Sequence, residues 1–289
     1  MSESRPDGGT ETRHVRIDAA RPAREQLRSV VDFAVREYRL AIRSNWASGL
    51  ALLFAALSVG VVLFGRSSIG AESVRAVVLS IAELSVYLVP LAALAFGYGA
   101  IVEPRQRGSL DLLLALPVPR WVVAVGIYLG RAAALASALV VGFGAGGLAL
   151  FRFGGGAGWG TYLALVAAAV AAGSAFLAVG LVVSTLAREK SHALGGVLLA
   201  WVWFVLIFDL LALGAVVGFD LPTAALVALL CANPATLFRL LVLSVAGSVS
   251  GGFGAVLASV PLDTASLAAA LLAWIVVPVA VSAALLGRR

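Results

Sequence analysis

Long apolar runs alternate with short polar segments along this chain of 289 residues. An α-helix needs about 20 apolar residues to cross the hydrocarbon core of a bilayer, and six runs reach that length. We therefore predict an all-α integral membrane protein with six transmembrane helices. Their predicted bounds are about 47–65, 76–102, 121–150, 161–185, 195–217 and 267–287.

The polar N-terminal segment divides into two parts. Residues 1–23 are polar and include glycine and proline, so we expect a disordered cytoplasmic tail. In residues 24–46 apolar and arginine-rich positions recur on opposite sides at helical spacing, which predicts an amphipathic helix. Because this helix leads directly into a span, we expect an elbow helix in the membrane interface. A solvated helix of a small cytosolic domain is the alternative.

The outer region, residues 218–266, lies between the fifth and sixth spans. Its two apolar stretches, 223–232 and 235–247, are each too short to cross a bilayer and are separated by Asn233 and Pro234. We expect two short interfacial or re-entrant helices there, followed by the turn-forming sequence "GSVSGGFG".

The placement of lysine and arginine predicts the orientation. With the N-terminus inside, the cytoplasmic segments hold sixteen of these residues and the outer segments hold four. Basic residues gather on the cytoplasmic side of membrane proteins. We therefore expect both termini inside, and hence an even number of spans, in a multi-pass protein of the cell membrane.

Composition excludes several functional classes. The chain is 61% hydrophobic and 12% charged, whereas soluble domains are about half apolar and about a quarter charged. The net charge of +6 does not indicate nucleic acid, because the basic residues flank apolar runs and face membrane lipid. Cys231, His14 and His192 are the only cysteine and histidines, so the sequence predicts no metal site.

The segment 103–120, "EPRQRGSLDLLLALPVPR", interrupts the apolar runs. Gly108 is expected to break the preceding structure, and Ser109 is a suitable N-cap for a short leucine-rich helix. Pro117 ends that helix, because a proline disfavours helical backbone in the residue before it. An exposed leucine-rich helix usually marks a docking surface. The alternative is that these leucines pack beneath the protein's own spans.

The segment and the span after it, "RGSLDLLLALPVPRWVVAVGIYLGR", resemble the signature of ABC-2 type permeases. In that family the short helix is a coupling helix that fits a groove on a separate cytoplasmic ABC ATPase. The resemblance implies that residues 47–287 form one ABC-2 transmembrane domain. The family pattern is matched at Glu103, Arg107, Gly108, Ser109, Leu110, Leu113, Leu114, Pro117, Val118 and Arg120. Pro119 and Ile127 depart from it, standing where the family has a serine and a lysine.

Two further stretches are similar to the NosY-like branch of that family: "FDLLALG" at 208–214 and "NPATLFRLLVLSV" at 233–245. Members of the branch assist the maturation of nitrous oxide reductase and are linked with copper processing. The resemblance therefore implies an extracytoplasmic maturation protein as a partner. It also implies an outer motif made of Asn233, Pro234, Phe238 and Arg239. Copper prefers soft or imidazole ligands, which are scarce here, so partners would have to bind the metal.

Three ionisable residues, Glu83, Arg131 and Asp209, fall inside predicted spans. A charge in lipid is costly, so each should line a translocation path or form a structural ion pair. Arg131 could pair with Glu83 or with Asp209. The third span also carries the pairs Gly126/Gly130 and Gly142/Gly146, a spacing that permits close helix packing. With 31 glycines in the chain, however, such pairs arise readily by chance, and chance is the stronger explanation.

The sequence contains no G-x-x-x-x-G-K-[ST] motif, so the chain itself is not expected to be an enzyme or to hold a cofactor. ATP and magnesium would belong to the partner ATPase. The leading hypothesis is a permease subunit of an ABC transporter, acting as a homodimer or with a paired permease. One alternative is an ABC-2 exporter of lipid or drug-like cargo. Another is a proton-coupled secondary transporter that uses Glu83 and Asp209.

Overall fold

The computed structural model describes residues 23–65, 71–110, 118–154, 158–219, 221–246 and 263–287. Every regular element in these ranges is a helix, which confirms the all-α prediction. The six-span prediction is also confirmed. The stretches long and apolar enough to cross a membrane are Asn45–Gly65, Val74–Gln106, Arg120–Phe153, Trp159–Leu186, Lys190–Gly218 and Thr264–Gly287.

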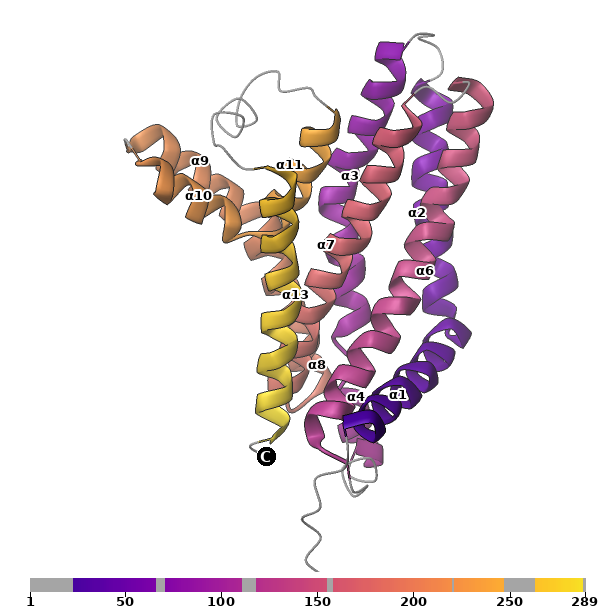
Figure 1. The fold of residues 1–289 in the computed structure, drawn as a ribbon, viewed down its shortest axis with the longest axis vertical. Coiled ribbons are helices and arrows are strands. Elements are labelled where there is room, and N and C mark those ends of the chain that lie inside the picture. The colour runs from indigo at the N-terminus through magenta and orange to yellow at the C-terminus, as the bar shows by residue number, and fades with distance from the viewer. Residues whose placement is uncertain are drawn as a thin grey trace, which may run out of the picture.

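The bundle is built from α2 (Asn45–Gly65), α3 (Ala71–Gly97), α6 (Arg120–Gly154), α7 (Trp159–Leu186) and α13 (Thr264–Gly287). These helices stand side by side in Figure 1. Helix α7 packs against α3, α6 and α13, and half of its residues are buried. The phenyl rings of Phe54 and Phe143 lie 5.2 Å apart between α2 and α6 and fill part of the same core.

Helix α6 carries a row of glycines against which two consecutive helices, α1 and α2, pack closely. A Cβ atom at Gly130 would lie 2.5 Å from the carbonyl oxygen of Ala34 in α1 (Ala23–Arg43). A Cβ atom at Gly142 would lie 2.6 Å from the Cβ of Phe54 in α2. Both distances are too short for a side chain, so the glycines permit the close approach of α1 and α2. The interpretation of these glycine pairs as chance is therefore wrong.

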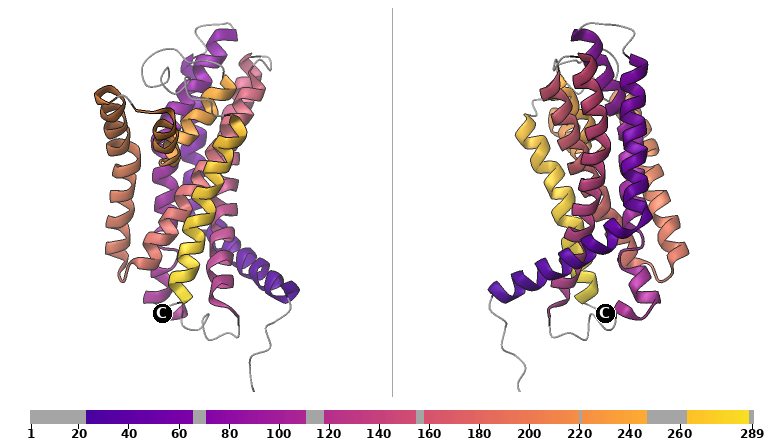
Figure 2. Two further views of the ribbon diagram at one scale, coloured as in Figure 1. Left: turned by 60° about the vertical axis from the view of Figure 1, so that its left-hand side comes forward. Right: turned by 90° about the vertical axis from the view of Figure 1, so that its right-hand side faces the viewer.

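The chain turns sharply between α1 and α2. Ser44 ends α1, and its hydroxyl donates a hydrogen bond to the carbonyl oxygen of Ala41. Helix α1 runs obliquely across the lower end of the bundle, while α2 stands along it (Figure 2). The helix thus forms where the amphipathic pattern places it, and its position in a membrane interface stays a prediction.

The fifth span contains an irregular helical turn and lies at the edge of the helix bundle. It consists of α8 (Lys190–Val202), the π-helical turn η1 (Trp203–Ile207) and α9 (Phe208–Gly218). In the most apolar stretch of this span only 17% of the residues are buried, against 56% in the corresponding stretch of α7. The span stands apart from the bundle in Figure 2. The sequence predicted a regular helix over 195–217, because an apolar period does not reveal a π-helical turn.

Two short helices, α10 (Thr223–Cys231) and α11 (Pro234–Ala246), follow the fifth span and are bent by 106° relative to each other. The indole of Trp274 in α13 donates to the carbonyl oxygen of Cys231 and ties the bend to the last span. Residues 247–262, which include the predicted "GSVSGGFG" turn, lie outside the described residues.

Helices α1 and α4 (Val102–Gln106), the turn between α7 and α8, and the C-terminal end of α13 all lie at one end of the bundle, which we call the α4 end (Figure 1). This shared end is the one that the sequence assigns to the cytoplasm. The orientation itself stays a prediction.

Candidate functional site

The 103–120 segment begins with a short helix that a glycine terminates. Gly108 has a φ angle of 70°, and its N–H donates to the carbonyl oxygen of Arg105. This left-handed conformation is common just after a helix end and favours glycine. The prediction of Ser109 as an N-cap is wrong, because Ser109 already lies in the next helical turn. Its hydroxyl donates to the carbonyl oxygen of Pro104 instead.

The central part of the segment, 111–117, lies outside the described residues, so Leu113, Leu114, Pro117 and the coupling helix itself stay predictions. Both flanks are anchored to the bundle. Leu110 is only 2% exposed and joins the hydrophobic core. On the return, Val118 packs against the same core, and the Arg120 guanidinium donates to the carbonyl oxygen of Leu286 at the end of α13.

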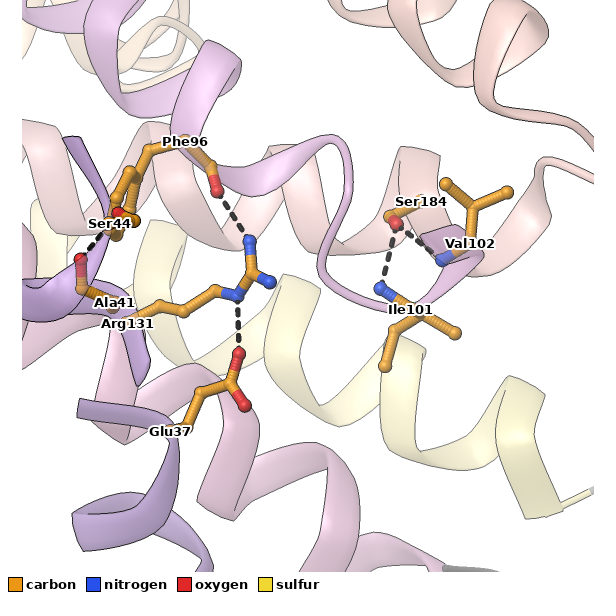
Figure 3. Close-up of polar contacts among 8 residues, drawn as sticks. All are labelled: Glu37, Ala41, Ser44, Phe96, Ile101, Val102, Arg131 and Ser184. Carbon is orange, nitrogen blue, oxygen red and sulfur yellow. Dashed lines mark hydrogen bonds and ion pairs between the residues drawn. The ribbon is translucent and has the colours of Figure 1, made fainter. Parts of the chain in front are cut away.

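The start of α4 is fastened to the end of α7. The hydroxyl of Ser184 accepts hydrogen bonds from the backbone N–H groups of Ile101 and Val102, at 2.9 Å and 3.1 Å (Figure 3). The guanidinium of Arg105 donates to the carbonyl oxygens of Thr185 and Ala187. The Ser184 hydroxyl thus accepts from N–H groups at the start of α4, and Arg105 donates to carbonyl groups at the end of α7, where a helix leaves such groups without intrahelical partners.

A salt bridge fastens α4 to the fifth span as well. The ammonium of Lys190, the first residue of α8, lies 2.5 Å from the carboxylate of Glu103. The same ammonium lies 5.6 Å from the centre of the Tyr98 ring. Helix α4 therefore contacts the ends of two consecutive spans, α7 through Ser184 and α8 through Lys190.

Arg131 joins three helices at the α4 end. Its Nε donates to the carboxylate of Glu37 in α1 at 2.9 Å, and its Nη1 donates to the carbonyl oxygen of Phe96 in α3 at 2.7 Å (Figure 3). The sequence left the partner of Arg131 open between Glu83 and Asp209, and in the structure its partner is neither of them but Glu37. Sequence reasoning missed Glu37. One signal in the sequence pointed to it: Glu37 is a carboxylate on the apolar side of an amphipathic helix, where a charged side chain needs a partner.

Glu83 and Asp209 share a different arginine. The guanidinium of Arg239 in α11 lies 3.0 Å from the Asp209 carboxylate in α9 and 3.8 Å from the Glu83 carboxylate in α3. The Asp209 Oδ1 atom is buried without a hydrogen-bond partner among the residues described. The Glu83 side chain is 58% exposed. We call these three residues the charged cluster.

Asn233 organises the outer motif. Its side-chain amide is fully buried and donates to the carbonyl oxygen of Phe204 at 2.8 Å, within the π-helical turn. Its Oδ1 accepts from the N–H of Ala235, which caps the helix that begins at Pro234. Phe238 is buried one turn further along. The outer motif therefore contacts η1 through Asn233 and places Arg239 beside Asp209 and Glu83.

Comparison with known proteins gives the chain its family. Residues 31–289 match the model of the family described as ABC-2 family transporter protein. The chain belongs to the ABC-2 transporter family. It is 35% identical over 266 residues to a probable ABC transporter permease protein NosY of Pseudomonas aeruginosa, covering 89% of this chain and 97% of that protein. A protein of the same name from Stutzerimonas stutzeri is 34% identical over 274 residues, covering 91% and 99%.

This ABC-2 permease is a multi-pass membrane protein and the transport subunit of an ABC transporter, which works with an ATPase subunit. The permease has two polar regions in the part of the chain that the structure describes. The α4 end carries both flanks of the 103–120 segment, whose coupling role stays a prediction, and the charged cluster lies next to Asn233 and Phe238 of the outer motif.

Proposed function

We propose that the ATPase subunit docks on the 103–120 segment, at the cytoplasmic face of the membrane. The main support is that α4 is attached to two spans, to α7 through Ser184 and to α8 through the Glu103–Lys190 salt bridge. ATP and magnesium bind to the ATPase, whose closure displaces the segment. Because α4 is held to α7 by hydrogen bonds and to α8 by a salt bridge, a movement of the segment moves the ends of both spans together.

We also infer that a second copy of the permease covers the charged cluster. A carboxylate facing lipid is costly, and the Glu83 side chain is 58% exposed in the single chain. The neighbouring fifth span is also largely uncovered, with Leu206 and Leu210 on its surface. A homodimer that joins these faces would place Glu83, Asp209 and Arg239 along a shared translocation path.

We infer the class of cargo from the relatives and from the metal-binding residue types of the chain. The named relatives and the 208–214 and 233–245 stretches support a role in the maturation of nitrous oxide reductase. The chain offers one cysteine and two histidines, and Met1 is its single methionine. Bare copper would find few of its preferred ligands along such a path. We propose that copper is bound by partner proteins, among them an extracytoplasmic maturation protein, and that the permease moves a different component.

The docking claim is tested by co-purification of the ATPase with full-length permease. A variant with Leu113→Asp and Leu114→Asp should insert normally and lose the ATPase, because two charges disrupt an apolar contact. The matched control carries Ser191→Asp and His192→Asp, which add two charges to the exposed start of α8 at the same end. The control should keep the ATPase. Equal retention in both variants, or equal loss, contradicts docking on this segment.

A further inference from the structure

A cavity of about 390 Å³ lies at the α4 end, among α1, α3, α4, α6 and the first turn of α8. Six charged side chains line it. Two acidic residues, Glu37 and Glu103, are already paired with Arg131 and Lys190 respectively. The cavity therefore carries a net charge of about +2 from its remaining basic residues, since such a pair is neutral as a whole.

Those remaining residues are Arg36, in the middle of α1, and Arg107, just after α4. Among the residues that the structure describes, neither guanidinium has an acidic partner or a hydrogen bond. The two come from elements that the sequence separates by about 70 positions, and both line this cavity. Two unneutralised guanidinium groups around one cavity favour an anionic ligand with several oxygen atoms.

One part of the cavity wall is apolar and exposed at the protein surface. Leu40 and Trp46 line it and are 53% and 58% exposed. Both belong to the stretch where α1 turns into the first span. An exposed tryptophan at the end of a span is typical of the level of the lipid headgroups. A ligand in this cavity can therefore place a charged group at the arginines and an apolar part along Leu40 and Trp46.

We propose that this cavity binds the phosphate-bearing headgroup of an anionic membrane lipid. Basic pockets between transmembrane helices on the cytoplasmic side suit such headgroups. The phosphate contacts Arg36 and Arg107, and the glycerol backbone and upper acyl chains lie against Leu40 and Trp46. Inorganic phosphate shares the charged chemistry but gains nothing from the apolar wall. A bound lipid would also bridge α1 to α4, and so connect the membrane surface to the segment on which we propose that the ATPase docks.

The experiment measures lipid retained by the purified permease–ATPase complex in detergent without nucleotide, by native mass spectrometry. The probes are phosphatidylglycerol, phosphatidylcholine and inorganic phosphate. The test variant carries Arg36→Gln and Arg107→Gln. The matched control carries Arg39→Gln and Arg188→Gln, which remove the same charge from exposed residues that do not line the cavity. A third variant, with Arg36→Lys and Arg107→Lys, preserves the charge.

We expect phosphatidylglycerol to bind more tightly than phosphatidylcholine, and the test variant to lose affinity by about tenfold or more. The control should retain wild-type affinity, and the lysine variant should fall between wild type and the test variant, because lysine lacks the bidentate geometry. Equal losses in test and control would show a diffuse surface effect and overturn the proposal. Equal binding of both lipids, or displacement of phosphatidylglycerol by millimolar phosphate, would overturn it as well. ATPase co-purification is scored in every sample, so a failure of docking is seen separately.

Discussion

The contact between α1 and α6 gives a prediction whose size follows from the structure. In Gly130→Ala, the new Cβ would lie 2.5 Å from the carbonyl oxygen of Ala34 and 2.9 Å from the backbone nitrogen of Tyr38. Both atoms belong to the backbone of α1, so no side chain can rotate away. The whole helix must shift. Overpacking of this kind costs about 1–3 kcal/mol.

A second glycine of α6 provides the matched control. A Cβ at Gly144 would have no neighbouring atom within 4 Å. Both substitutions replace a helical glycine by alanine, so both gain the same helix propensity, about 1 kcal/mol. The difference between Gly130→Ala and Gly144→Ala therefore isolates the contact between α6 and α1.

The assay is the thermal unfolding of purified permease in detergent. Gly130→Ala should melt at a lower temperature than Gly144→Ala, which should equal or exceed the wild type. Equal melting temperatures for the two variants would refute the argument, because they would show that α1 is not held against α6 at this distance. ATPase activity of the complex, measured on the same samples, reports whether a displaced α1 also affects coupling.

Three further predictions concern polar contacts. Arg131→Gln should lower the melting temperature more than the double variant that also carries Glu37→Gln, because the single change leaves a carboxylate that is only 13% exposed without its partner. Asn233→Ala should cost about 1–3 kcal/mol in unfolding measurements, because it removes both the hydrogen bond to the carbonyl oxygen of Phe204 in the π-helical turn and the N-cap of α11. Arg239→Gln should lower transport by normally inserted protein, and restoring activity with an added Asp209→Asn would indicate a structural ion pair rather than a path-lining role.

The spans could be predicted from the sequence because each depends on a local property. A run of about 20 apolar residues crosses a bilayer whatever it packs against. The bend at Asn233 and Pro234 was also foreseeable, since proline interrupts a helix within an apolar stretch. Local rules of this kind place elements along the chain and leave open which elements touch.

The partners of the charged residues could not be predicted for that reason. Arg131 binds Glu37, which precedes it by 94 positions, and Arg239 binds Asp209, which precedes it by 30. The sequence offers several carboxylates for each arginine, and only the packing of whole helices chooses among them. A carboxylate on the apolar stripe of α1 was the one visible clue.

The glycine pairs of α6 show a similar limit. Their spacing permits close packing, yet it cannot say what packs there. In the folded chain, Gly126 and Gly130 face α1 whereas Gly142 and Gly146 face α2. Helix α6 thus positions both α1 and α2. This packing depends on the tertiary structure, and the sequences of α1 and α2 carry no pattern that predicts it.

Photo-cross-linking from position 113 tests the central claim most directly. A photoreactive amino acid replaces Leu113 in the full-length permease, and the membranes are irradiated with the ATPase present. We predict a cross-link to the ATPase that a photoreactive residue at the exposed position 191, in the first turn of α8, does not give. Cross-links from position 113 to the permease's own spans alone would contradict the claim and show that these leucines pack beneath the bundle.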